Sequence, residues 1–297
     1  MEVWEIVERV RKQKGITISE FCGEEVSRSV YDRFVKNEAD TTVSKLTYFL
    51  DRINLDYDEL KIFNYPDNVN AVSHMMKEIQ TAFLSKDTEE LQRIAEFCRV
   101  KQSNPSKREE NLMNLCDLLT ARLRGDAIDV EESNVYQYLI NTHTWTHYEL
   151  ILFNNCMFVF TPEFVELILE RAMMSLSIYK DSLKGRSESF RMLANAIVYF
   201  IQNDQRSYAW KYLERLDEFH LEEDMYFEMN LRLLLQGIWE VLRGNEQGKE
   251  KVHQSLKVCE YLSSKQYQSM NYDLLKYIEQ LFEVDFELTG ITTAILS

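Results

Sequence analysis

The sequence predicts an all-α protein in which an N-terminal helix-turn-helix domain, residues 1–65, precedes a tetratricopeptide-like α-solenoid, residues 66–297. Three observations lead to this fold class. Only 8 Gly and 3 Pro occur in 297 residues, too few for the many tight turns of a β fold. Apolar residues recur with the helical period along most of the chain. Helix pairs return at intervals of roughly 35–40 residues, as in helical repeat proteins.

Short helices are expected to fill residues 3–63, and their ends carry local signals. Gly15 ends the first helix, and Thr17 with Glu20 forms a capping box for the second. Ser27 is a favourable N-cap for the third, and Asn37 tolerates the left-handed conformation at its end. A tight turn between the second and third helices is typical of a helix-turn-helix domain. The expected helices span residues 3–14, 17–22, 27–37, 42–53 and 56–63, and the fourth should bury Val43, Leu46, Phe49, Leu50 and Ile53.

The second part of the chain is expected to begin near Pro66, which cannot continue a helix that starts before it. Beyond it, the apolar period and breaks such as Gly125, Gly185 and Gly244 predict a series of helix pairs. Such pairs stack into a right-handed solenoid with a concave groove. The apolar tail 286–297 could cap the last repeat or contact a partner subunit. The expected helices span about 68–84, 87–102, 106–124, 131–142, 145–159, 162–180, 187–203, 205–219, 223–243, 246–263 and 265–282.

Charge is unevenly distributed along the chain. The net charge is −15, yet residues 9–36 carry seven Lys and Arg against four Asp and Glu. An acidic body repels nucleic acid, so contact with DNA would be confined to this basic segment. The helix after Ser27 is apolar on one side and basic on the other, which suits a DNA major groove. The same pattern also describes an ordinary solvated helix, and both interpretations stay open on this pattern alone.

The N-terminal segments resemble a known DNA-binding fold. They are similar to the phage-repressor (XRE-type) helix-turn-helix, and more closely to that of the Rgg/MutR regulators within the RNPP group of pheromone-responsive regulators. Val35 and Asn37 depart from the family, which often has Glu and Gly there. The segments that carry this resemblance are Gly15–Cys22, Ser27–Phe34 and Val43–Asn54.

The resemblance continues in the second part of the chain. The segments Trp145–Asn155, Ala194–Tyr199, Leu235–Gly237 and the following Gly244 fall in the order of the Rgg family. Membership would imply a cytoplasmic, homodimeric transcription regulator of the quorum-sensing type, controlled by a short peptide pheromone in the groove of its repeats. A two-fold dimer would read an inverted repeat in double-stranded DNA, with half-sites about one helical turn apart or a multiple of that.

Candidate DNA contacts follow from the expected helices. Arginine forks to guanine edges and lysine pairs with phosphate. We expect base-edge contacts from Arg28, Ser29, Asp32 and Arg33. We expect phosphate contacts from Arg9, Arg11, Lys12 and Lys36.

Candidate peptide contacts are polar side chains on the inner helix of each pair. Asparagine can bond both the N–H and the C=O of an extended peptide, and arginine can hold a carboxylate. Each such residue could instead be a cap or part of a polar network in the core. The candidates are Asn155, Arg191, Asn195, Tyr199 and Asn230.

We expect no catalytic site, no metal and no cofactor. The sequence holds no glycine-rich nucleotide motif. His143 and His147 have a metal-binding spacing, but they lack both the intervening Glu and an evident third ligand. The alternative function is that of a Rap-like repeat protein, which binds or dephosphorylates a response regulator. Such proteins begin with a helical bundle, and the N-terminal pattern here favours the helix-turn-helix.

The remaining features point to a cytoplasmic protein without a membrane segment. No window offers about 18 uncharged apolar residues, and the first residues lack a basic stretch followed by an apolar one. The five cysteines are scattered and form no CxxC motif. We therefore expect reduced, mostly buried thiols.

Overall fold

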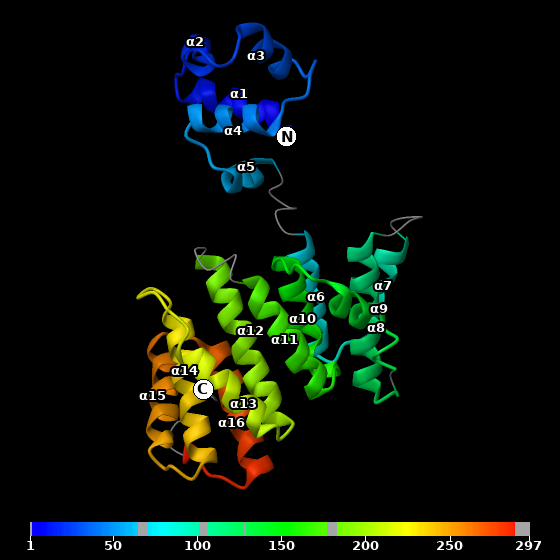
Figure 1. Cartoon of the computed structure of the whole chain (residues 1–297), viewed down its shortest axis with the longest axis vertical. Coiled ribbons are helices and arrows are strands. Elements are labelled where there is room, and N and C mark those ends of the chain that lie inside the picture. The colour runs from blue at the N-terminus through cyan, green and yellow to red at the C-terminus, as the bar shows by residue number, and fades with distance from the viewer. Residues whose placement is uncertain (1, 65–70, 101–105, 128, 177–182, 289–297) are drawn as a thin grey trace. The chain divides into compact units, whose positions relative to one another are not determined.

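The computed structural model describes residues 2–64, 71–100, 106–127, 129–176 and 183–288. Every regular element in these residues is a helix (Figure 1), which confirms the all-α prediction. The chain divides into two compact units, Met1–His74 and Met75–Ser297. The division falls within helix α6 (Ala71–Leu84), most of which belongs to the second unit. The linker expected around Pro66 lies outside the described residues, so the boundary after residue 65 stays a prediction.

The first unit contains five short helices whose caps match the local signals. The Thr17 side chain accepts from the backbone N–H of Glu20 at 3.2 Å, and Ser27 accepts from the N–H of Val30 at 3.4 Å. Gly15 and Asn37 end their helices with φ of 68° and 57°. The helices are α1 (Val3–Gln13), α2 (Ile18–Cys22), α3 (Arg28–Val35), α4 (Val43–Arg52) and α5 (Tyr57–Asn64).

An aromatic cluster forms the centre of this unit. Phe49 stacks on Phe21 with ring centroids 5.0 Å apart and meets Phe34 at 5.1 Å. Tyr31 closes on Phe21 edge to face. The prediction that Val43 is buried is wrong: it is 76 % exposed, because it is the first residue of α4 and precedes the turns that reach the core.

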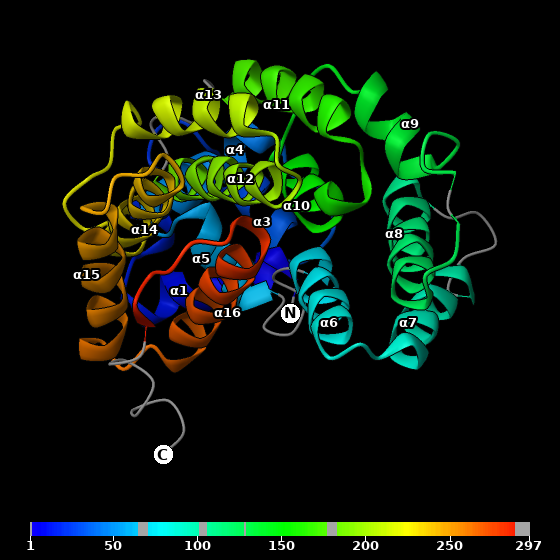
Figure 2. The same ribbon diagram turned by 90° about the horizontal axis from the view of Figure 1, so that it is seen from below.

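The second unit is an array of helices that curves in space. Figure 2 shows α11, α13 and α15 on the outer side of the curve and α10, α12 and α14 on the inner side. This arrangement confirms the predicted α-solenoid. Its elements are α6 (Ala71–Leu84), α7 (Thr88–Val100), α8 (Lys107–Arg124), α9 (Asn134–Asn141), α10 (His147–Cys156), the 3-10 helix η1 (Met157–Val159), α11 (Pro162–Leu176), α12 (Leu183–Gln202), α13 (Arg206–Asp217), α14 (Tyr226–Leu242), α15 (Gly248–Tyr261) and α16 (Lys265–Phe282).

One predicted break is wrong. Gly185 was expected to separate two helices, but it lies in the first turn of α12. The Ser189 hydroxyl donates to the Gly185 carbonyl, four residues earlier, at 2.7 Å. Serine commonly makes this contact inside an α-helix. A glycine costs a helix about 1 kcal/mol relative to alanine, and tertiary packing overrides a cost of that size.

Two glycines allow α14 and α15 to cross closely. A Cβ on Gly237 would lie 2.7 Å from the carbonyl oxygen of Gly248, and a Cβ on Gly248 would lie 2.4 Å from that of Gly237. Real Cβ atoms do not approach so near, so neither position accepts a side chain without movement of the helices. The two helices can therefore lie this close together because neither residue has a side chain, and not because glycine has a more flexible backbone.

The cysteines are buried, as predicted from the sequence. All five are free. Among the described helices, none is long and apolar enough to cross a membrane. The apolar tail from residue 289 lies outside the described residues.

Candidate functional site

The outward face of α3 is basic and exposed. Arg28, Ser29, Arg33 and Lys36 are exposed, as predicted from the sequence pattern. Asp32 is half-buried and lies 3.8 Å from the Arg28 guanidinium. At that distance and exposure the ion pair is weak, so the guanidinium remains available to another acceptor.

A buried cluster attaches α3 to α1. The Tyr31 hydroxyl of α3 donates to the Glu8 carboxylate, and the Arg11 Nε lies 2.8 Å from Glu8 Oε2 and 3.0 Å from the Tyr31 hydroxyl. Burial alone would raise the pKa of Glu8, but the hydrogen bonds from Arg11, Tyr31 and Lys12 outweigh it and lower that pKa to about 2. The carboxylate is therefore charged at every physiological pH and holds both partners.

The prediction of a phosphate contact for Arg11 is wrong. Its side chain is only 8 % exposed, and its guanidinium donates to Glu8, Tyr31 and the Ile16 carbonyl. The candidates Arg9 and Lys12 are exposed on the same helix, although Lys12 also lies 3.1 Å from Glu8. Of the α1 candidates, these two keep a cation at the surface.

Polar contacts link successive inner helices of the second unit at a recurring separation. His147 to Glu188, Asn154 to Asn195 and Ser187 to Glu228 are each 41 residues apart. These pairs join α10 to α12 and α12 to α14. We call the residues Asn154, Ser187, Glu188, Arg191, Asn195, Phe227 and Glu228 the inner row. A spacing of one repeat in the sequence could have indicated these partners, which sequence reasoning missed.

Arg191 is the most strongly positioned candidate in the inner row. Its Nε and Nη2 both lie 2.9 Å from Glu228 Oε1, and its guanidinium lies over the Phe227 ring, 4.5 Å from the centroid. The Ser187 hydroxyl donates to the same carboxylate oxygen at 2.6 Å. The Glu228 side chain is 5 % exposed, whereas that of Arg191 is 46 % exposed. The buried Glu228 carboxylate therefore fixes the Arg191 guanidinium, while about half of the Arg191 side chain remains accessible to a ligand.

Two asparagine candidates, Asn195 and Asn155, are also accessible. Asn195 lies one turn further along α12 and is exposed, and its amide nitrogen donates to the side-chain Oδ1 of Asn154 at 3.3 Å. Asn155 is half-exposed, with its amide nitrogen bonded to the Ile151 carbonyl of its own helix at 2.8 Å. Arg191 and Asn195 thus share one face of α12.

The structure contradicts Tyr199 as a candidate and engages only one end of the Asn230 side chain. Tyr199 is 6 % exposed, its hydroxyl donates to the Phe160 carbonyl at 2.6 Å, and burial raises its pKa to about 12. Asn230 directs its amide nitrogen at the Ser255 carbonyl and at the Cys259 Sγ of α15, at 3.3 and 3.4 Å. The Tyr199 side chain is occupied in helix packing, which the sequence could not distinguish from an open polar position. Asn230 is half-exposed and its Oδ1 has no partner in the described residues, so its contact with a peptide stays a prediction.

The structure does not place His143 and His147 on one helix. His143 precedes α10, whereas His147 is its first residue and lies 2.5 Å from Glu188 through Nδ1. Within the described ranges, no group of three or more His, Cys, Asp or Glu could hold a metal ion.

Comparison with solved structures shows the same fold in bacterial regulators. A candidate transcriptional regulator from Listeria monocytogenes EGD-e is 19 % identical, with a TM-score of 0.84 over 95 % of this chain and 99 % of that one. The SHP pheromone receptor Rgg2 of Streptococcus dysgalactiae is 17 % identical, with a TM-score of 0.75 over 94 % and 99 %. A bacterial peptide pheromone/receptor complex is 15 % identical, with a TM-score of 0.68 over 93 % and 98 %.

A family model locates the chain more narrowly. Residues 92–272 match the model described as "HTH-type transcriptional regulator Rgg, C-terminal domain". The match spans α8 to α15 completely and therefore includes the whole inner row. The chain belongs to the Rgg family of helix-turn-helix-type transcriptional regulators.

Proposed function

We propose that this Rgg-family chain binds double-stranded DNA through α3 and is controlled by a short peptide pheromone bound at the inner row. The single observation that carries the proposal is the family match. The exposed cations of α3 support its first half, and the open face of Arg191 and Asn195 supports its second. The α2–α3 pair and the short helices around it favour this function over the Rap-like alternative.

In the DNA-bound state, α3 lies in the major groove. Arg28, Ser29, Asp32 and Arg33 lie near base edges. Arg9, Lys12 and Lys36 contact phosphates. Removal of one phosphate contact should lower the salt dependence of binding by about one counterion, and removal of a base contact should relax specificity at one position.

Fluorescence anisotropy with DNA from upstream of the gene tests this half. The Arg28→Ala/Arg33→Ala variant should lose sequence-specific binding. The matched control is Arg93→Ala/Arg99→Ala, which removes the same charge from two exposed arginines of α7. Equal binding by both variants would refute the assignment of α3 to DNA recognition.

The proposed peptide site combines one guanidinium group with the side-chain amides of two asparagines. One related structure is described as a pheromone receptor and another as a peptide pheromone/receptor complex. In this chain Arg191 would hold a carboxylate of the peptide, and Asn195 with Asn155 would bond its backbone. Because Glu228 already neutralises Arg191, the peptide carboxylate must share the guanidinium with it.

Calorimetric titration with synthetic peptides encoded beside the gene tests this half. Asn195→Ala should weaken binding by roughly tenfold, since one lost hydrogen bond costs about 1 kcal/mol and an unpaired buried group costs more. Asn203→Ala is the control, because Asn203 lies beyond the end of α12 and its amide nitrogen bonds the Tyr199 carbonyl of its own chain. If none of the peptides binds the wild-type chain, the ligand of the repeat unit must be another molecule.

For a peptide to control DNA binding, it must bind one conformation of the protein more tightly than another. The chain acts as a homodimer in this proposal, and the peptide shifts the balance between two dimer geometries because it binds one of them better. Analytical ultracentrifugation with and without peptide, followed by DNA titration of each state, tests this step. Identical DNA affinity with and without saturating peptide would refute peptide control.

A further inference from the structure

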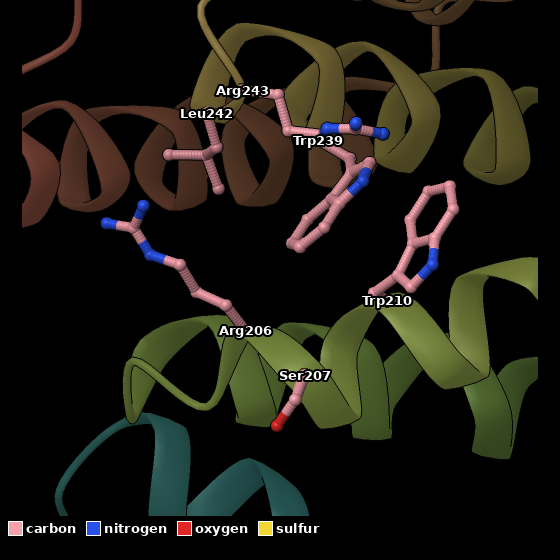
Figure 3. Close-up of a pocket in the computed structure, with 6 residues that line it drawn as sticks. All are labelled: Arg206, Ser207, Trp210, Trp239, Leu242 and Arg243. Carbon is pink, nitrogen blue, oxygen red and sulfur yellow. The ribbon is translucent and has the colours of Figure 1, made fainter.

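A cleft with two tryptophans lies between the first turns of α13 and the last turn of α14, away from the inner row. It has a volume of about 420 Å³ and is lined by Arg206, Ser207, Trp210, Trp239, Leu242 and Arg243. Figure 3 shows Trp239 between Arg206 and Trp210, with Arg243 extended towards Trp210. An adjoining hollow of about 470 Å³ shares Trp210, Trp239 and Arg243.

The tryptophans offer an aromatic surface to a ligand. Their rings are stacked, with centroids 5.6 Å apart and planes inclined by 20°. Trp239 is 8 % exposed and forms the floor, whereas Trp210 is 38 % exposed. A surface tryptophan held in place by a second ring is a preformed platform for another planar ring.

The cleft is positive although the chain is acidic. Its lining contains two arginines and no carboxylate. Arg206 is paired with Asp204 at 3.0 Å, but Arg243 lies within ion-pair distance of no carboxylate in the described part of the chain. Its guanidinium instead lies 5.2 Å from the Trp210 centroid.

The carboxylates of the adjoining hollow are engaged elsewhere. Glu240 lies 2.5 Å from the Lys251 ammonium, and Asp217 accepts from the Gln236 amide at 2.8 Å. Arg243 is thus the cation beside the rings that remains open to an anion.

A second donor stands beside Arg243. The indole Nε1 of Trp239 is buried and has no acceptor in the residues that the structure describes, which is uncommon for a buried N–H. Figure 3 shows this nitrogen on the side of the ring nearer to the Arg243 guanidinium. One anionic oxygen placed there would satisfy the indole and pair with the arginine.

We propose that this cleft binds a small planar aromatic molecule with one anionic group, its ring against Trp210 and its anion on Arg243 and Trp239 Nε1. The volume fits such a molecule, since small-molecule sites begin near 300 Å³. The proposal is independent of the peptide site, because no residue of the cleft belongs to the inner row.

Calorimetric titration of the full-length chain tests the proposal, with indole-3-acetate and phenyl phosphate as anionic probes and indole as the neutral probe. At least one anionic probe should bind saturably, and indole should bind roughly ten- to a hundredfold more weakly, the range expected for a charge-assisted hydrogen bond.

Variants then locate the site. Arg243→Gln should weaken the anionic probe to the level of indole, and Trp210→Leu should weaken both probes. The control is Arg122→Gln, which removes an arginine that lies over Phe158 at 5.5 Å and leaves this cleft unchanged. Failure of both anionic probes to bind, equal binding of indole, or binding that survives Arg243→Gln overturns the proposal.

Discussion

Replacement of Glu8 by Gln should loosen the attachment of α3 to α1. The Glu8 side chain is 19 % exposed, and its pKa is lowered from 4.5 to about 2 by its partners. The interval between these two values corresponds to roughly 3 kcal/mol of stabilisation, at about 1.36 kcal/mol per pH unit. The loss of a partner for a buried cation has a similar cost, about 3–5 kcal/mol. Arg11 keeps Tyr31 and the Ile16 carbonyl in the variant, so we expect the lower end of that range.

Hydrogen exchange measured by mass spectrometry on the full-length chain can detect this loss. A cost of roughly 3 kcal/mol corresponds to about 100-fold faster exchange in the peptides that cover α1 and α3, since about 1.4 kcal/mol is tenfold. Peptides from α14 and α15 should be unchanged and serve as the internal reference. Tyr31→Phe removes one partner of Glu8 but keeps Arg11, so its effect should be smaller, about 1 kcal/mol.

The effect has a defined pH dependence. A carboxylate whose folded pKa lies below its unfolded pKa stabilises the fold above the unfolded value and loses that contribution as pH falls through the folded one. The difference between wild type and Glu8→Gln should therefore be complete above pH 4.5 and disappear as pH falls towards 2. The exposed Glu24→Gln should show no such difference. Wild-type exchange rates in Glu8→Gln at neutral pH would refute the assignment of Glu8 as the anchor of α3.

Three further predictions concern stability and reactivity. Ser27→Ala should cost about 1 kcal/mol, visible as roughly fivefold faster exchange in α3 and nowhere else; unchanged exchange would contradict the cap. Gly237→Ala should lower the free energy of unfolding by about 1–3 kcal/mol through overpacking against Gly248, measured by urea denaturation; an unchanged midpoint would mean that α14 and α15 separate freely. Burial raises the pKa of Cys116 to about 12, so iodoacetamide at neutral pH should modify this thiol only after denaturation, and rapid modification of the native chain would contradict its burial.

The features that the sequence predicted well are those set by neighbours in the chain. The caps at Thr17 and Ser27 and the left-handed ends at Gly15 and Asn37 depend on residues within one helical turn. Helix positions follow from the apolar period, which burial against a partner helix imposes at every repeat. Such signals can be read from the sequence without knowledge of the tertiary structure.

The errors at Arg11 and Tyr199 concern partners that are distant in sequence. Arg11 resembles any basic residue of an amphipathic helix until Tyr31, 20 residues away, is placed beside it. Tyr199 resembles an open polar residue until its hydroxyl meets the Phe160 carbonyl, 39 residues away. The intrinsic preference of Gly185 predicts a helix break, yet the residue lies within α12. Polarity alone cannot tell an exposed side chain from one paired across the core.

The contacts of the inner row also restrict how a ligand could act. Asn195 connects α12 to α10 through Asn154, and Arg191 connects α12 to α14 through Glu228. A ligand that takes up either side chain must share or replace a contact that holds two helices together. Its binding free energy is then linked to the packing of the repeats, because the states with and without these contacts differ in affinity for it. The same residues would both recognise the ligand and transmit its presence along the solenoid, without a separate relay.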